Sequence, residues 1–281
     1  TLFRSQVPKN QSGYALGTLS TGTVAGTLMG PLLGGLIAEQ FGMRNVFLLV
    51  GFFLFLVSVL TWWGIEEDYQ QISKEEHLSS WDLLASIQHK DILLGLFLTS
   101  MTIQMIGQSI SPILPLYVRE LGQSDNVIFV SGLIVSAMGI SSILTSGWMG
   151  KLGDKIGNHR LLLLALLYSG ILYIFCALAQ TPFQLGFLRL LFGIGTGALM
   201  PGVTALLNRM TPKEGISRIF SYNQLFFYVG GVLGPMMGSS IAMHVNYHWV
   251  FYGTAILAFI DLAFLLFIFR KYLKVREISA H

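Results

Sequence analysis

Charged side chains are scarce in this sequence. Asp, Glu, Lys and Arg make up 11% of the residues, whereas a soluble domain carries about 25%. Hydrophobic residues make up 53%, and the mean hydropathy is +0.65. Water is therefore not the main solvent of this chain, and the composition excludes an ordinary soluble domain.

Cysteine is almost absent, because Cys176 is the single one. A disulfide within the chain and a cysteine metal cluster are thereby excluded. The sequence also lacks an HExxH motif, a Ser/His/Asp grouping and paired carboxylates inside apolar runs. We therefore expect no catalytic residues, no metal site and no cofactor, which argues against the alternative of a polytopic membrane enzyme. The histidines His159, His244 and His248 lie at the ends of apolar runs, where solvation in a loop is sufficient explanation.

Long apolar runs are what the sequence has in abundance. Each is about as long as the 20 residues that a helix needs to cross a bilayer. In lipid, a backbone satisfies its own hydrogen bonds only as a helix or a closed barrel, and these runs lack the alternation of a barrel strand. We expect an all-α membrane protein with eight transmembrane helices near residues 12–38, 44–64, 92–117, 127–149, 161–179, 183–207, 217–243 and 248–269.

The basic residues orient these helices. With the N-terminus in the cytoplasm, only Arg44 and Arg119 fall outside, and Arg189 falls just inside a span. Such an asymmetry follows the positive-inside rule. We expect a multi-pass protein of the cell membrane of a bacterium, with both termini cytoplasmic. The net charge of +3 then reports orientation in the lipid bilayer, and we expect no nucleic acid as a partner.

The first two apolar runs are repeated by the last two. A fixed offset of 204 residues, as from Gly30 to Gly234, superposes Gly30-Pro31 on Gly234-Pro235 without a gap. Six spans lie between the start of the first copy and the start of the second, and parallel six-helix halves build the major facilitator transporters. The interpretation is a C-terminal fragment covering helices 5–12 of twelve, with the first four missing. Residues 1–64 would end the N-terminal half, 65–90 would form a cytoplasmic central loop, and 91–281 would form the C-terminal half.

Glycine and proline are concentrated in the first apolar run, which contains GTLMGPLLGG. Together with a glycine nine residues upstream, this stretch resembles the major facilitator pattern G-x8-G-x3-G-P-x2-G-G, which is typical of drug:proton antiporters in that superfamily. The matching residues are Gly17, Gly26, Gly30, Pro31, Gly34 and Gly35.

Glycines at every fourth position form a ridge without side chains, along which another helix backbone can approach closely. Pro31 removes one hydrogen bond and bends the helix at this ridge. The same design recurs near the C-terminus at Gly230, Gly234, Pro235 and Gly238. We expect both helices to be bent gating elements that meet partners from the opposite half, with packing alone as the alternative.

Two further motifs resemble the same superfamily. GKLGDKIGNHR is similar to its loop motif at Gly150, Asp154, Lys155, Gly157 and Arg160, with Asn158 in place of a basic residue. The resemblance implies a clasp that holds the cytoplasmic side shut, in which Asp154 accepts hydrogen bonds from the N-terminal end of helix 5 near residues 13–17. A solvated basic turn is the alternative. LGFLRLLFGIGTGA is similar to the pattern of helix 4, repeated here on helix 10.

The resemblance covers the whole chain and is nearest to Gram-positive multidrug (fluoroquinolone-type) efflux permeases of the twelve-helix drug:proton antiporter family. It implies a monomeric secondary transporter that exports small lipophilic or cationic drugs by alternating access, with protons entering in exchange and the proton gradient as energy source. Two alternatives stay open. One is a dedicated exporter of a metabolite such as a sugar or peptide, and the other is a truncated chain that is inactive by itself.

Charges inside a membrane span are functional candidates by default. Arg189 lies about seven residues into its span, where its side chain either snorkels to the outer surface or serves function. Asp261 is the only carboxylate deep within a span. It is either a neutral acid facing helix 10 or 11, or a protonation site, while we expect the main proton carrier in the missing helices.

Polar and aromatic side chains at helical spacing predict a substrate cavity. Uncharged donors edged by flexible methionines suit drugs of varied shape, and aromatic faces attract cations. Interhelical hydrogen bonding and ordinary aromatic packing are the alternative. The residues of the predicted cavity wall are Gln104, Gln108, Ser111, Tyr222, Asn223, Gln224 and Phe227.

Overall fold

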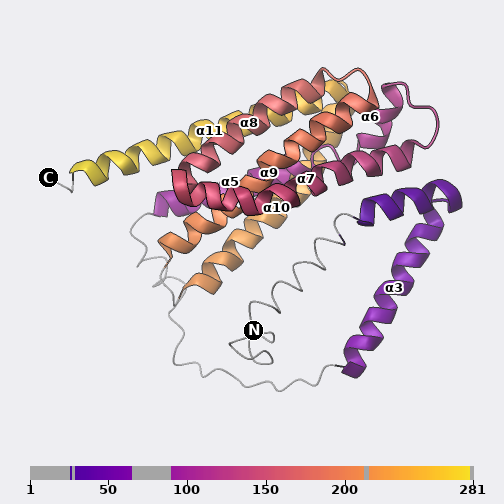
Figure 1. The fold of residues 1–281 in the computed structure, drawn as a ribbon, viewed down its shortest axis with the longest axis horizontal. Coiled ribbons are helices and arrows are strands. Elements are labelled where there is room, and N and C mark those ends of the chain that lie inside the picture. Colours follow the sequence, from indigo (N-terminus) through magenta and orange to yellow (C-terminus); the bar gives the residue numbers. More distant parts are fainter. Residues whose placement is uncertain (1–25, 27–28, 65–89, 212–214, 279–281) are drawn as a thin grey trace. The chain divides into compact units, whose positions relative to one another are not determined.

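The computed structural model describes residue 26 and residues 29–64, 90–211 and 215–278 (Figure 1). Within these ranges the chain is helical and contains no strand. A helix at 29–41 comes first. The labelled helices are α3 (Met43–Gly64), α5 (Lys90–Gln108), α6 (Leu114–Glu120), α7 (Val127–Ile156), α8 (Asn158–Ala177), α9 (Pro182–Met210), α10 (Ile216–His244) and α11 (Tyr247–Ile278).

Seven of the described helices are long and apolar enough to cross a membrane. They confirm the all-α fold and coincide with seven of the eight expected spans. The expected span at 12–38 lies mostly outside the described residues, apart from the helical residues 26 and 29–38.

The span expected at 92–117 differs from the structure, because it is divided into α5 and α6 by a non-helical segment at 109–113. Pro112 has no backbone N–H to donate, and it disfavours helical geometry at the preceding residue. Tyr117 anchors the short α6 on α11, with its ring centroid 5.0 Å from that of Phe251. The apolar run is thus continuous in the sequence, although the helix is interrupted at 109–113.

The contacts divide the chain into two compact units. The first includes helix 29–41, α3 and the start of α7, residues 125–136. Within it, a Cβ added to Gly35 would lie 3.1 Å from the carbonyl oxygen of Ile128, and one added to Gly132 would meet the carbonyl oxygen of Pro31. The Glu39 carboxylate accepts a hydrogen bond of 3.2 Å from the Ile128 N–H. Helix 29–41 therefore lies directly against the first turns of α7.

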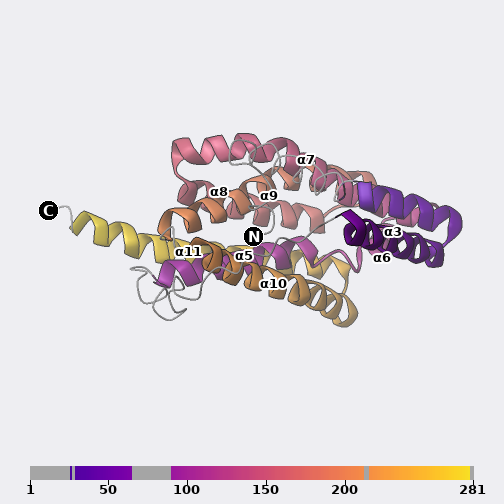
Figure 2. The same ribbon diagram turned by 90° about the horizontal axis from the view of Figure 1, so that it is seen from below.

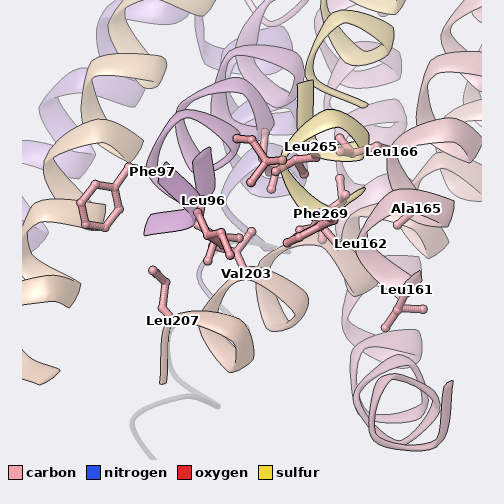
Figure 3. Close-up of a cluster of buried hydrophobic side chains, with 14 of the residues drawn as sticks. Leu96, Phe97, Leu161, Leu162, Ala165, Leu166, Val203, Leu207, Leu265 and Phe269 are labelled. Carbon is pink, nitrogen blue, oxygen red and sulfur yellow. The ribbon is translucent and has the colours of Figure 1, made fainter. Parts of the chain in front are cut away.

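The second unit comprises residues 78–124 and 137–281. In it α5 packs against α9, α10 and α11, and α8 packs against α9 and α11 (Figure 2). Figure 3 shows Leu96 of α5 beside Val203 of α9, with Leu265 of α11 and Leu162 of α8 in the same hydrophobic cluster. Buried apolar side chains of α5, α8, α9, α10 and α11 thus meet in one cluster.

Candidate functional site

The glycine ridge of α10 lies against the backbone of α5. A Cβ added to Gly230, Gly234 or Gly238 would meet, in turn, the carbonyl oxygens of Met101, Met105 and Ser109. Because backbone atoms cannot move aside as a flexible side chain can, only glycine fits this seam. The ridge thus joins two helices of the same half, and our expectation that its partner belongs to the opposite half is wrong for α10.

The corresponding ridge near the N-terminus has a different environment. In the part of the chain that the structure describes, a Cβ added to Gly26, Gly30 or Gly34 meets no atom within 4 Å. Gly17 lies outside the described residues. The contacts of this helix are instead made by Gly35 and by the Pro31 carbonyl, both with α7, so the gating role of the motif stays a prediction.

The predicted cavity residues divide into buried and accessible members. Asn223 is 3% exposed, and its Oδ1 accepts a hydrogen bond of 2.7 Å from the hydroxyl of Ser100. Its side chain joins α10 to α5, so its placement on an open cavity wall is wrong. Tyr222 packs against the hydrophobic cluster of the core. Interhelical bonding, the alternative interpretation, therefore holds for Asn223.

Tyr222 is half-buried, and the remaining members also keep part of their surface accessible. Gln104 and Gln108 of α5 and Phe227 of α10 are half-buried, and Gln224 is exposed. The exposed Ser111 hydroxyl donates to Oε1 of Gln108 over 3.0 Å. A Cβ added to Gly231 would lie 3.6 Å from the Gln104 side chain, which places this amide over α10. We call these five residues the α5–α10 wall.

The loop motif forms the turn between α7 and α8. Gly157 has a φ of +96°, a conformation that side chains other than glycine rarely adopt. Asn158, which replaces a basic residue of the motif, is 4% exposed, and a Cβ on Gly153 would collide with its Oδ1. A charged side chain at position 158 would therefore be buried in the turn without water.

Asp154 approaches Arg209 of α9, with 3.6 Å between its Oδ1 and Nη2. Both side chains are exposed, so the pair contributes little to stability. Lys155 and Arg160 are exposed as well. Residues 13–17, the expected partner of Asp154, lie outside the described residues, and the clasp stays a prediction. Gly150 and Asp154 line a cavity of about 610 Å³ together with Pro201 and Asn208 of α9.

Arg189 is 3% exposed, so the first of its two interpretations, snorkelling to the outer surface, is wrong. Its Nη1 donates to the hydroxyl of Tyr173 over 3.3 Å, and its guanidinium lies 5.8 Å from the ring centroids of Tyr173 and Phe192. Aromatic faces attract a cation, which offsets part of the cost of its burial. The Tyr173 hydroxyl donates in turn to the carbonyl oxygen of Ile106 over 2.6 Å, in the last turn of α5 before the break.

Asp261 is 5% exposed and faces α5. The interpretation as a neutral acid placed it against helix 10 or 11 of twelve, which are α9 and α10 in the structure, and that placement is wrong. Its Oδ1 accepts a hydrogen bond of 3.1 Å from the Thr99 hydroxyl. Its Oδ2 is buried and has no hydrogen-bond partner in the described structure.

The sequence interpretation overlooked Thr99, Tyr173 and the role of His248. His248 is half-buried, with its Nδ1 2.6 Å from the carbonyl oxygen of Ala177, so solvation in a loop is the wrong explanation for it. Thr99 has a visible signal, since two adjacent hydroxyls, Thr99 and Ser100, interrupt an apolar run. Tyr173 has no such signal, because one tyrosine in an apolar helix is compatible with simple packing.

These features define a polytopic α-helical membrane protein with a discontinuous helix at its core. The family model of the Major Facilitator Superfamily matches residues 1–131 and again residues 92–280. The chain therefore belongs to the Major Facilitator Superfamily, and this membership indicates a transporter.

Relatives from several bacteria match nearly the whole chain. The Multi-drug resistance efflux pump PmrA of Streptococcus pneumoniae serotype 4 is 60% identical over 99% of this chain and 69% of the relative. A PmrA homolog of Lactococcus lactis is 49% identical over the same shares. The Multidrug resistance protein MdtG of Salmonella arizonae is 46% identical over 90% of this chain and 63% of the relative.

Solved structures support the fold. A bacterial homolog to the human lysosomal transporter Spinster, in an inward-facing and unoccupied conformation, has a TM-score of 0.77 at 17% identity. The match covers 97% of this chain and 74% of that one. The likeness shows a shared fold.

Proposed function

We propose that this chain is part of a proton-coupled multidrug exporter that works by alternating access in the bacterial cell membrane. The observation that carries the proposal is the 60% identity, over 99% of the chain, to a pneumococcal multidrug efflux pump. Both termini would lie in the cytoplasm, the protein would act as a monomer, and small lipophilic or cationic drugs would be its substrates. The proton gradient would supply the energy.

The α5–α10 wall supports this substrate class. It combines the amides of Gln104, Gln108 and Gln224 with the hydroxyl of Ser111 and the ring of Phe227, and it contains no formal charge. Neutral donors and acceptors beside an aromatic face bind amphiphilic molecules without demanding one fixed partner. A cationic drug would gain from the ring of Phe227 without neutralising a buried carboxylate.

The close contact between the glycine ridge of α10 and the backbone of α5 supports a rigid α5–α10 wall. Because α5 and α10 touch backbone to backbone, they move as one body when the transporter changes state. Alternating access needs such bodies to rock around a central site. Helix 29–41 meets the start of α7 through Pro31 and Gly132 within the first unit.

Inverted membrane vesicles test the proposal directly. The complete reading frame that encodes this chain is expressed, the vesicles are energised, and a pH dye follows the proton gradient while drugs are added. Ethidium or a fluoroquinolone should dissipate the gradient, and Pro31→Leu should abolish the response although the protein is present. If no lipophilic cation produces a response, while a sugar or peptide does, the dedicated metabolite exporter is the correct function.

A further inference from the structure

Two buried polar contacts join α11 to α5 and to Ser109, the residue that follows the end of α5. At one of them, the hydroxyls of Ser109 and Thr254 lie 3.0 Å apart, and Thr254 donates to the carbonyl oxygen of Val250 over 2.7 Å. These two neutral groups satisfy each other inside the protein. At the other contact, Thr99 donates to Oδ1 of Asp261. We call the pair of contacts the α5–α11 seam.

The Asp261 contact differs from the Ser109 contact in having an unsatisfied atom. Oδ2 of Asp261 is buried and has no hydrogen-bond partner in the described structure. An ionised carboxylate with one hydrogen bond and no cation would lose several kcal/mol on removal from water. A protonated carboxyl has no net charge, and its Oδ1 still accepts the bond from Thr99. Protonation of Oδ2 therefore removes the buried charge, which is the larger part of the cost, and leaves one neutral hydroxyl without an acceptor in the described structure.

The helices packed against α11 offer Asp261 no described cation. On α5, the charged residues Lys90 and Asp91 lie in the first turn, roughly 12 Å along the helix axis from Thr99. On α8, His159 and Arg160 lie in the first turn, and the His159 ring contacts Phe269, about two turns along α11 from Asp261. The hydroxyls of Tyr168 and Tyr173 donate to backbone carbonyls of α9 and α5. On α10, Arg218 lies in the first turn and His244 is the last residue, with its Nδ1 2.9 Å from the Ser240 carbonyl oxygen. Thr99 is the described hydrogen-bond partner of Asp261, and a hydroxyl cannot replace a counter-ion.

A structural role alone does not require an acid at this position. The Ser109–Thr254 contact ties α11 to the residue after α5 with hydroxyls alone, and it leaves neither hydroxyl oxygen unsatisfied. An aspartate in the same seam adds one property that hydroxyls lack, which is the capacity to bind and release a proton.

We propose that Asp261 is a proton-binding residue of the transport cycle and holds its proton on Oδ2 while the α5–α11 seam is closed. The proposal rests on the proton-coupled export proposed above. Release occurs when the seam opens and water reaches Oδ2. The O–H bond then breaks, its electron pair stays on the carboxylate, and the proton passes to a water molecule.

The seam is linked to the α5–α10 wall through one residue of α5. Ser100, the neighbour of Thr99, donates to Asn223 of α10, and one turn further Gln104 lies over Gly231. A change in the Asp261 contact therefore acts on the helix that carries Gln104 and Gln108. Proton binding on α11 and drug binding beside α10 would share α5 as their common element.

The test compares Asp261→Asn with Ser109→Ala in vesicles of the complete reading frame. Asn has the shape of a protonated Asp but binds no proton. We expect Asp261→Asn to reduce gradient-driven drug efflux by about tenfold or more, while drug counterflow without a gradient stays within about twofold of wild type. Ser109→Ala changes the same seam without removing an acid, and it should retain both activities.

The outcomes separate this proposal from the proposed function. If wild-type vesicles respond to no drug, the exporter function fails, and the role of Asp261 in its cycle fails with it. If wild type responds and Asp261→Asn drives efflux equally well, the exporter stands and the assignment of Asp261 is overturned.

Infrared spectroscopy provides a readout that does not depend on transport. The carbonyl stretch of a buried protonated carboxyl should be present in wild type and lost in Asp261→Asn. Asp261→Glu keeps a titratable carboxyl, so the band should shift and coupling should persist. If the Asn variant fails to fold, Asp261→Glu alone tests the proposal. A carbonyl band at the same position in Asp261→Glu as in wild type would overturn it.

Discussion

Single glycines in α10 have sharply different surroundings. A Cβ on Gly230 would run into the carbonyl oxygen of Met101, whereas one on the next residue, Gly231, would lie 3.6 Å from the flexible Gln104 side chain. The first contact is with the backbone and cannot relax without separating the helices. The second is an ordinary van der Waals distance. Glycine at 230 is therefore a packing requirement, and glycine at 231 is not.

We predict that Gly230→Ala destabilises the protein by about 1–3 kcal/mol, the usual cost of overpacking a close contact. Gly231→Ala serves as the matched control. It should be neutral or stabilising by up to about 1 kcal/mol, because alanine favours the helix. Thermal unfolding of the detergent-solubilised protein measures both. Equal unfolding temperatures for the two variants would show that the backbone contact of Gly230 does not constrain the fold.

Arg189 is a buried cation with an unsatisfied atom, because its Nε has no hydrogen-bond partner in the described structure. Replacing a buried charge by an apolar side chain of similar volume is often neutral or stabilising by about 1–4 kcal/mol. We predict that Arg189→Met unfolds at the same or a higher temperature, since the hydroxyl of Tyr173 keeps its bond to Ile106. A fall in the unfolding temperature would instead mean that the bond from Arg189 to Tyr173 stabilises the end of α5.

At the scale of helices, the sequence was sufficient to predict which segments form spans, but not which helices pack together. Long uncharged runs can only be helices in lipid, so seven spans coincide with the structure. The glycine ridge at 230–238 predicts that another helix backbone packs closely against it. Because any helix could supply that backbone, the ridge does not predict that the partner is α5. The assignment of Asn223 to a cavity wall failed in the same way. Its hydrogen bond with Ser100 joins residues that are distant in the sequence, and no sequence pattern pairs them. The break before α6 was missed although Pro112 marks it.

Two glycines of the loop motif, Gly157 after α7 and Gly150 within α7, have different surroundings. Gly157 has positive φ, and a Cβ there would lie 2.9 Å from the His159 ring, whereas a Cβ on Gly150 meets no atom within 4 Å in the described structure. We predict that Gly157→Ala lowers stability by about 1–2 kcal/mol, while Gly150→Ala does not. Chemical unfolding followed by tryptophan fluorescence measures this difference. If Gly150→Ala keeps the fold but abolishes drug efflux, that glycine serves the transport cycle.

At the scale of the whole molecule, the lone cysteine makes the proposed topology testable. Cys176 is buried, so the unmodified chain offers a thiol reagent little to label. Val245, between α10 and α11, is 60% exposed and falls outside the cell in the proposed orientation. Lys151, near the end of α7, is exposed and falls in the cytoplasm. The two positions therefore lie at opposite membrane surfaces if both termini are cytoplasmic.

We predict that a membrane-impermeant maleimide labels Val245→Cys in intact cells and labels Lys151→Cys only after the membrane is opened. The physical reason is the distribution of Lys and Arg, which are retained on the cytoplasmic side during insertion. The wild-type chain, with Cys176 alone, is the control and should stay unlabelled in both conditions. The reverse pattern would invert every loop, placing the Asp154 turn outside the cell. It would then contradict both the cytoplasmic clasp and the direction of export.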